Sequence, residues 1–152
     1  MQKTTLDRVQ LDAWRSFLVA HAALIDRLGE EMESETELPL TWYEVLLLLN
    51  ESKDAQLRMH ELAESRLLSR SAMTRFIDRM EAAGLVGRVT CDADRRGTYV
   101  TMTELGQERF REAAVVHLRG IEEHFARHVT DAEAEVLAVS MRRVATGLDD
   151  QA

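Results

Sequence analysis

The side chains best suited to chemistry in this sequence are arginines and short hydroxyls, and they gather in one segment. Residues 66–96 hold seven arginines against four acidic residues, although the 152-residue chain carries a formal net charge of −8. Arginine binds phosphate oxygens and guanine edges, and serine and threonine hydroxyls bind either. The segment is therefore a candidate surface for duplex DNA, because affinity for DNA depends largely on such cations.

A capped amphipathic helix would present these side chains. Ser69 is a typical N-cap residue, and Gly84 is a typical helix stop because glycine adopts the left-handed conformation at little cost. Apolar residues at spacings of three and four predict one buried stripe, namely Met73, Phe76, Ile77 and Met80. The other surface holds the predicted DNA contacts of the helix: Ser69, Arg70, Ser71, Thr74, Arg75 and Arg79. A lone helix of this kind is more often simply solvated, so the interpretation depends on the segment after Gly84.

Two short runs rich in β-branched residues come next, at 85–90 and 98–102, and they predict a hairpin with a long tip. The tip carries Arg95 and Arg96. A hairpin beside a recognition helix can place arginine in a narrow minor groove, where the negative potential is strongest. The hairpin therefore favours DNA binding over the solvated alternative.

Acidic residues beside these arginines need a separate explanation, because phosphates would repel them. We expect Asp92 or Asp94 to hold an arginine of the helix or loop in position, and we assign Asp78 to the same wing-positioning set. Calcium binding is the competing idea. It is disfavoured because no further oxygen ligands occur at the spacing of a calcium loop.

Upstream, residues 59–66 predict a short helix, and Leu67-Leu68 forms the turn before Ser69, which is helix-turn-helix spacing. An ordered set of residues over the central third of the chain follows one known pattern: Glu61-Leu62-Ala63, Ser71, Thr74-Arg75, Asp78-Arg79-Met80-Glu81, Gly84-Leu85-Val86, Arg88, Asp92, Asp94-Arg95-Arg96, Val100 and Met102-Thr103-Glu104-Leu105-Gly106. In these residues the chain resembles the MarR family of winged helix-turn-helix transcription regulators.

The resemblance implies a homodimer that binds a palindromic operator. It implies that residues 70–79 enter the major groove and that Arg95 or Arg96 enters the minor groove. It also implies a repressor that leaves the DNA when a small ligand, a metal or an oxidant arrives. A winged-helix module that binds protein without binding DNA is the rival interpretation, since a fold does not determine a function.

The predicted fold class is mainly α, with a small β-hairpin wing and long terminal dimerisation helices. We expect a single domain over 1–152, with a winged helix-turn-helix region at 38–102 and helical dimerisation regions at 6–33 and 103–148. The acidic stretch 30–37 is expected to end the first helix. Thr103 is expected to cap a helix that runs to about Arg127, and capping boxes are expected at Thr41-x-x-Glu44 and Thr130-x-x-Glu133.

The long helices carry more apolar residues than a small core can bury. The first helix alone keeps helical apolar spacing over about seven turns. Pairing with a second subunit would cover these stripes, so we expect a two-fold homodimer. An intramolecular helical bundle is the alternative.

Candidates for effector binding are fewer. We expect a cleft that would bind a small aromatic or anionic effector, as members of the MarR family bind such molecules. Its candidate lining residues are Trp14, His21, Trp42 and Tyr43. Aromatic residues on helix stripes more often belong to the core, which is the alternative for each of them.

Metal and redox sensing are secondary alternatives. His124 and His128 have the i, i+4 spacing of a metal-binding pair, but the chain has one cysteine and no H-E-x-x-H arrangement. A solvated or dimer-facing pair is favoured, and neither a metal nor a cofactor is assigned. Cys91 lies near arginines that would stabilise a thiolate, yet no resolving cysteine is present. A zinc- or redox-responsive regulator of the same fold stays open.

Catalytic signatures do not appear in the sequence. It has no glycine-rich phosphate loop, no G-x-S-x-G elbow and no zinc-hydrolase motif, so we expect no enzyme activity. No apolar run reaches transmembrane length, and the first residues lack the apolar stretch of a secretion signal. A single cysteine fits a reducing compartment. We therefore expect a cytoplasmic protein without a membrane partner.

Overall fold

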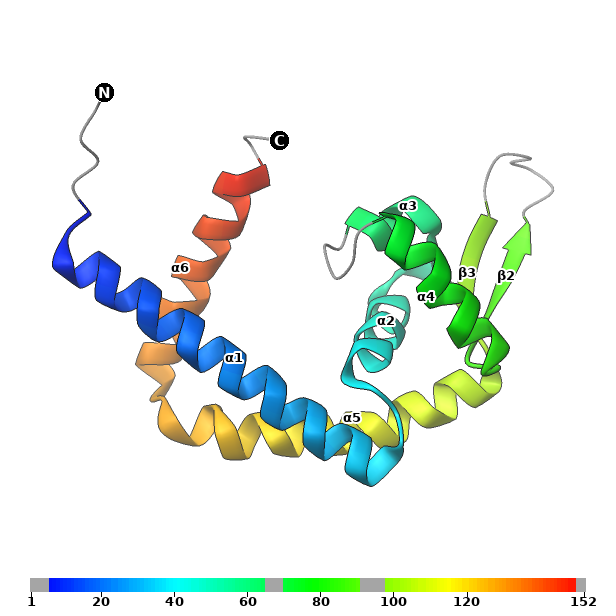
Figure 1. Ribbon diagram of the computed structural model, residues 1–152, viewed down its shortest axis with the longest axis horizontal. Coiled ribbons are helices and arrows are strands. Elements are labelled where there is room, and N and C mark those ends of the chain that lie inside the picture. Colours follow the sequence, from blue (N-terminus) through cyan, green and yellow to red (C-terminus); the bar gives the residue numbers. More distant parts are fainter. Residues whose placement is uncertain (1–5, 65–69, 91–97, 150–152) are drawn as a thin grey trace. The chain divides into compact units, whose positions relative to one another are not determined.

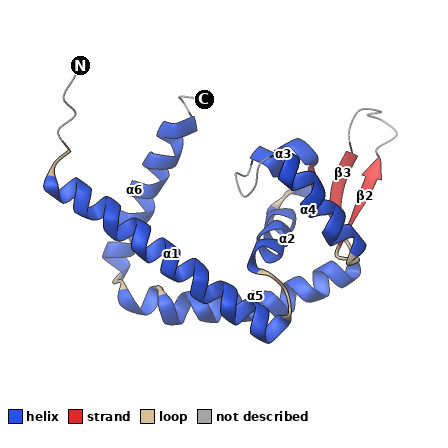
Figure 2. Ribbon diagram, in the orientation of Figure 1, coloured by secondary structure: helices blue, strands red, loops and turns tan. Residues whose placement is uncertain are grey.

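The computed structural model describes residues 6–64, 70–90 and 98–149 (Figure 1). Helices dominate these residues, and a small sheet interrupts them (Figure 2). In chain order the elements are α1 (Arg8–Thr36), α2 (Leu40–Glu51), the 3-10 turn η1 (Lys53–Ala55), β1 (Gln56–Arg58), α3 (Met59–Glu64), α4 (Arg70–Ala82), β2 (Val86–Thr90), β3 (Thr98–Met102), α5 (Glu104–His124), the 3-10 turn η2 (Ala126–His128) and α6 (Asp131–Asp149). The predicted mainly α class with a hairpin and long terminal helices is confirmed.

The described residues fall into two compact units. The winged unit is Leu28–His117, and the terminal unit comprises the described parts of Met1–Arg27 and Leu118–Ala152. The boundary between them falls inside α1 and α5, so the units do not coincide with the predicted regions 38–102, 6–33 and 103–148. The division of the chain into a DNA-binding and a dimerisation region stays a prediction.

The sheet has three antiparallel strands in the order β1-β3-β2. In this register Tyr99 of β3 lies opposite Arg58 on one side and Val89 on the other. The predicted hairpin supplies β2 and β3. Strand β1 was not predicted because three residues are too few to show an alternating pattern.

The core of the winged unit contains the apolar residues of α4 that their spacing predicted to be buried. All four stripe residues of α4 are buried, and Met73, Ile77 and Met80 are completely inaccessible. They share the interior with apolar residues of the neighbouring elements, including Val45, Leu46 and Leu49 of α2, Leu62 of α3 and Val100 of β3. Helix α4 is therefore held on its apolar side by α2, α3 and the sheet.

Helix α1 runs through most of the acidic stretch 30–37 and ends within it. It stops at Thr36, where the Thr36 hydroxyl donates to the Met32 carbonyl at 2.7 Å and accepts from the Leu38 amide at 3.2 Å. Glu37 then takes a positive φ of 55°. These local bonds replace helical partners that are missing at the end of α1.

The capping box expected at Thr41 is wrong. Helix α2 begins two residues earlier than this box implies, at Leu40, with Pro39 in place of Thr41 as the N-cap residue and no side-chain capping bond. The Pro39 carbonyl instead accepts from the amides of Trp42 and Tyr43 at 2.9 and 3.1 Å.

The caps of the later helices are confirmed. The Thr103 hydroxyl accepts from the Gly106 amide at 3.0 Å and donates to the Gly84 carbonyl at 2.6 Å, so it joins α5 to the turn after α4. Thr130 and Glu133 form the expected reciprocal capping box of α6. The amide and the hydroxyl of Thr130 both donate to the Glu133 carboxylate, and these two bonds hold the pKa of that carboxyl below its usual value. Helix α5 ends at His124, short of the expected Arg127, and η2 comes after it.

The terminal unit leaves its apolar residues uncovered. Fifteen of the eighteen large hydrophobic side chains that are exposed among the described residues belong to it, and no large hydrophobic side chain described in this unit is buried. Between its helices lies an apolar groove of about 930 Å³. The groove is lined by Ala13, Ser16, Phe17, Ala20, His21, Ala23, Leu24, Arg27, His124, Phe125, Val129, Leu137, Ser140 and Met141. Among the described helices, none is both long and apolar enough to cross a membrane.

Candidate nucleic-acid interface

The exposed face of α4 carries the predicted contacts. Thr74, Arg75 and Arg79 are all exposed, while the opposite face of the helix is buried. Arg70 and Ser71 lie in the first turn of the helix. The Thr74 hydroxyl and the guanidinium groups of Arg75 and Arg79 thus project from one side of a helix that comes after α3 and contacts it, as in a helix-turn-helix reading head.

The end of α4 determines where the wing begins. The Leu85 amide donates to the Met80 carbonyl at 3.0 Å, and the Gly84 amide donates to the Glu81 carbonyl at 2.9 Å. With Gly84 at a φ of 76°, this is a Schellman stop, and the predicted role of this glycine is confirmed. The chain passes directly from this stop into β2.

An arginine of β2 clamps the wing to the helix. The Arg88 Nη2 atom lies 2.5 Å from Asp78 Oδ1, and its Nη1 atom donates to Glu81 Oε2. One guanidinium group therefore bridges two carboxylates that lie one turn apart on α4. The wing-positioning role assigned to Asp78 stays a prediction, but this contact gives it a partner. Arg88 itself was missed, although its charge beside two acidic helix residues was a usable signal.

A second link joins β3 to the start of α3. The Arg58 Nε atom donates to the Tyr99 hydroxyl at 2.9 Å, and the guanidinium carbon lies 5.0 Å from the Tyr99 ring centroid. The Arg58 amide donates to Glu61 Oε2 at 2.6 Å and so caps the first turn of α3. Arg58 was also missed, because its partner lies 41 residues away in the sequence.

Several predicted site residues lie outside the described residues. These are Ser69 before α4, the tip arginines Arg95 and Arg96, and the tip aspartates Asp92 and Asp94. The candidate redox residue Cys91 is also outside.

The four candidate effector residues divide between the two units. In the terminal unit, the Phe17 ring lies 6.1 Å from Trp14 and 5.9 Å from His21, and His21 lines the apolar groove. In the winged unit, Trp42 is half-buried, whereas Tyr43 is only 3% exposed. Tyr43 therefore behaves as a core residue, and its effector role stays a prediction.

Tyr43 belongs to an aromatic cluster with two residues of α5. Its ring stacks on Phe110 at 5.5 Å and lies 4.7 Å from the His117 ring. Burial raises the pKa of the Tyr43 hydroxyl, and the charge of Glu51 raises it further. Burial also lowers the pKa of His117, whose Nδ1 atom is inaccessible and has no hydrogen-bond partner among the described residues. The cluster is thus built around a neutral imidazole.

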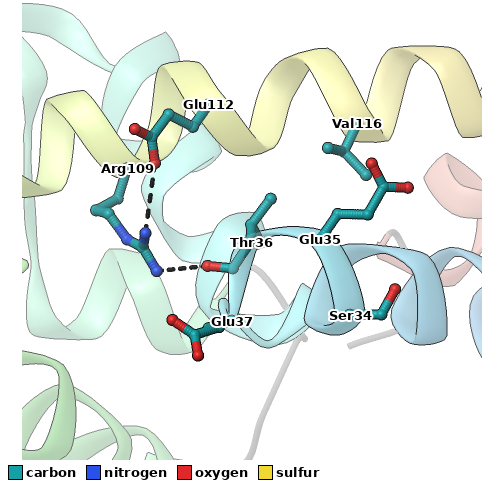
Figure 3. Close-up of a pocket in the computed structure, with 7 residues that line it drawn as sticks. All are labelled: Ser34, Glu35, Thr36, Glu37, Arg109, Glu112 and Val116. Carbon is teal, nitrogen blue, oxygen red and sulfur yellow. Dashed lines mark hydrogen bonds and ion pairs between the residues drawn. The ribbon is translucent and has the colours of Figure 1, made fainter.

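A polar pocket of about 560 Å³ lies where the end of α1 meets α5 in the winged unit (Figure 3). Arg109 reaches across it, donates to the Thr36 carbonyl and lies 3.4 Å from Glu112 (Figure 3). The arginine therefore satisfies a carbonyl at the C-terminus of α1, where positive charge also suits the helix dipole. Its role here is structural.

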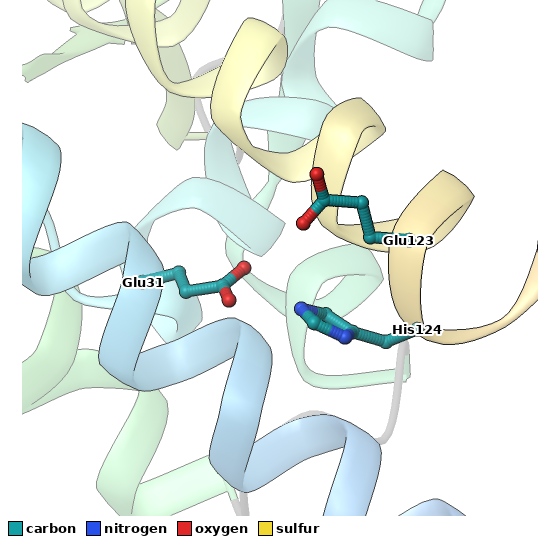
Figure 4. A group of neighbouring side chains, drawn as sticks. All are labelled: Glu31, Glu123 and His124. Atoms are coloured by element: carbon teal, nitrogen blue, oxygen red, sulfur yellow. The ribbon is translucent and has the colours of Figure 1, made fainter.

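The histidine pair considered as a metal site is not a helical pair. His124 is the last residue of α5, next to Glu123 (Figure 4), whereas His128 belongs to η2. The i, i+4 spacing that brings two imidazoles together requires one continuous α-helix. The preference for a solvated or dimer-facing pair stays a prediction.

Comparison with known proteins agrees with this geometry. A model described as "MarR family" matches residues 36–97. The HTH-type transcriptional repressor MdtR of Bacillus subtilis is 31% identical over 91 residues, which is 59% of each chain. The Streptomyces coelicolor MarR family regulator Sco3205, solved in complex with DNA, is 31% identical with a TM-score of 0.88, over 97% of this chain and 92% of its own. AbsC from the same organism is 30% identical with a TM-score of 0.88, over 97% of this chain and 99% of its own.

Proposed function

Because the chain belongs to the MarR family of transcriptional regulators, we propose that it binds a palindromic DNA operator as a homodimer and represses transcription there. The observation that carries DNA binding is the exposed arginine face of α4, fixed to the wing by Arg88. Thr74 and Arg75 lie in its N-terminal half, which is the part of a recognition helix that contacts base edges. Repression is supported by the likeness to MdtR, which is named a repressor.

Dimer formation is supported by the terminal unit. Its exposed apolar residues and its apolar groove would be unfavourable in water, since patches of this kind mark protein interfaces. A second copy of the chain presents the same surface and can cover it by two-fold symmetry. Two recognition helices would then read two half-sites about 34 Å apart.

Release from the DNA by an effector follows from the family resemblance. In the terminal unit, Trp14 and His21 retain accessible surface, and an aromatic or anionic molecule suits the Trp14 ring and the His21 imidazole. In the winged unit, Trp42 also retains accessible surface. We include a small effector that releases the DNA because the family resemblance implies one. A screen for compounds that release the bound duplex would identify it.

The decisive experiment is selection of duplexes from a random pool at physiological salt, with binding titrations over a range of salt concentrations as the second step. Arg75→Ala should abolish selective binding while the protein stays folded. Arg111→Ala, an exposed arginine of α5 outside the reading head, is the matched control and should bind normally. Binding that is absent, or insensitive to salt and to Arg75, would favour the protein-interaction module instead.

A further inference from the structure

The guanidinium group of Arg79 contacts the aromatic ring of Phe76. Its guanidinium carbon lies 5.6 Å from the centroid of Phe76, one turn earlier on α4, which is within the range of a cation–π contact. Among the residues that the structure describes, Arg79 makes no ion pair. The two acidic residues nearest to it on the helix, Asp78 and Glu81, are both engaged by Arg88.

The kind of contact matters for a DNA-binding arginine. An ion pair would neutralise the guanidinium charge and occupy its N–H donors. A ring face orients the guanidinium group electrostatically but leaves the charge and the donors available for phosphate oxygens. Arg79 is therefore both restrained in direction and competent to bind an anion.

Phe76 is itself held in place. Its side chain is 5% exposed, and the Trp42 ring of α2 meets it edge-on, with 6.5 Å between the centroids and 78° between the planes. Edge-to-face pairs at this separation are favourable. Trp42 thus connects α2 to the aromatic residue that supports Arg79.

We propose that Trp42 and Phe76 form a two-ring support that positions Arg79 as a contact to the DNA phosphate backbone. This inference rests on the DNA binding proposed above and gives Trp42 a positioning role in place of an effector contact. Arg79 lies in the C-terminal half of α4, beyond the first turns that reach base edges, so its contact is sequence-independent.

The test is a double-mutant cycle on the full-length protein, using the duplex obtained by selection. Arg79→Gln should weaken binding and reduce the slope of log affinity against log salt by about 0.9, the value for one lost phosphate contact. Phe76→Leu keeps an apolar side chain but removes the ring face, and should weaken binding about two- to fivefold, the strength of a cation–π contact. In the Arg79→Gln background, Phe76→Leu should have no further effect.

Variants of Trp42 and a core control complete the design. Trp42→Phe retains an aromatic edge and should bind nearly normally, whereas Trp42→Leu should reproduce the loss seen with Phe76→Leu. Met80→Leu changes a completely buried residue of the same stripe and should leave the salt slope unchanged. Thermal unfolding of each variant identifies any loss caused by unfolding.

The possible results distinguish failure of the two-ring support from failure of the proposed DNA binding. If the wild-type protein binds DNA but the effects of Phe76→Leu and Arg79→Gln add, Phe76 has only a structural role and the two-ring support is wrong. An unchanged salt slope for Arg79→Gln overturns the phosphate contact. If the wild-type protein binds no duplex at any salt concentration, both the proposed function and this inference fail.

Discussion

Arg88 Nη2 lies 2.5 Å from Asp78 Oδ1, and this contact joins the first strand of the wing to the recognition helix. The same guanidinium group reaches Glu81, so the strand cannot rotate away from α4 without breaking two ion pairs. The bridge lies at the surface, where the Asp78 side chain is 56% exposed. Its value for stability is therefore small, of about 0–1 kcal/mol, and its effect should be mainly on geometry.

Arg88→Ala should consequently weaken DNA binding more than it weakens folding. We expect affinity for the selected duplex to fall about tenfold, equivalent to roughly 1.4 kcal/mol, with little change in the unfolding midpoint. Fluorescence anisotropy and urea unfolding measure the two quantities. Arg88→Lys keeps the charge but cannot bridge both carboxylates with one planar group, so it should recover only part of the affinity. Unchanged binding by Arg88→Ala would show that the clamp does not position the wing.

Gly106 marks a close approach between α5 and the start of β2. A Cβ atom at this position would lie 2.0 Å from the Leu85 carbonyl oxygen and 2.8 Å from the Met102 side chain. Backbone must therefore move to admit even a methyl group. We expect Gly106→Ala to lower the free energy of unfolding by about 1–3 kcal/mol, measured by urea unfolding.

Gly29 provides the matched comparison. It also lies in a helix of the winged unit, but a Cβ atom there has nothing within 4 Å. Gly29→Ala should raise the free energy of unfolding by up to about 1 kcal/mol, because alanine favours the helix. Equal effects of the two substitutions would contradict the close approach at Gly106.

His117 predicts a defined dependence of stability on pH. Burial lowers its pKa in the folded protein, so the unfolded chain binds the proton more readily. Its contribution is fully present above the unfolded value of 6.5 and decreases as the pH falls through 6.5 toward the lower folded pKa. Urea unfolding at about pH 8 and about pH 5.5 should therefore show a loss at the lower pH.

Substitutions can show whether His117, and not one of the other four histidines, causes the loss of stability at low pH. His117→Phe keeps a ring against Tyr43 and should remove part of the acid-dependent loss. His60→Gln changes an exposed histidine of α3 and should leave the loss intact. If the wild-type and His117→Phe proteins respond equally to pH, the buried imidazole does not control acid sensitivity.

Local signals in the sequence were sufficient for the recognition helix. Met73 and Met80 are buried as their spacing predicts, and Gly84 ends the helix because a positive φ is needed there. The caps at Thr103 and Thr130 were predictable because each hydroxyl accepts a hydrogen bond from an amide only three residues further along the chain. Such interactions depend on neighbours in the chain, so a single sequence reveals them.

Contacts between residues far apart in the sequence could not be predicted from such local patterns. Tyr99 holds Arg58 across 41 residues, and Trp42 meets Phe76 only after α2 and α4 pack. Trp42 was assigned as an effector residue from its type alone, and its contact with Phe76 of α4 was not predicted. The effector role itself stays a prediction. The capping box at Thr41 was wrong for a different, local reason, since the Pro39 carbonyl already accepts from the first amides of α2.

The apolar groove of the terminal unit gives a direct test of the dimer. Leu137 of α6 lines the groove and is 40% exposed, so a second copy that covers the groove would bury it. Leu137→Glu would place a charge in that interface, where it has no assigned partner. We expect the variant to sediment as a monomer at concentrations at which the wild-type protein is a dimer.

The control is Val89→Glu, which adds the same charge at an exposed apolar residue of the wing strand β2. It should leave the dimer intact, because β2 belongs to the winged unit and does not line the groove. Leu137→Glu should also weaken operator binding strongly, since a monomer holds one half-site where a dimer holds two. A Leu137→Glu protein that still sediments as a dimer would show that subunits associate through another surface, and the groove would then require a different occupant.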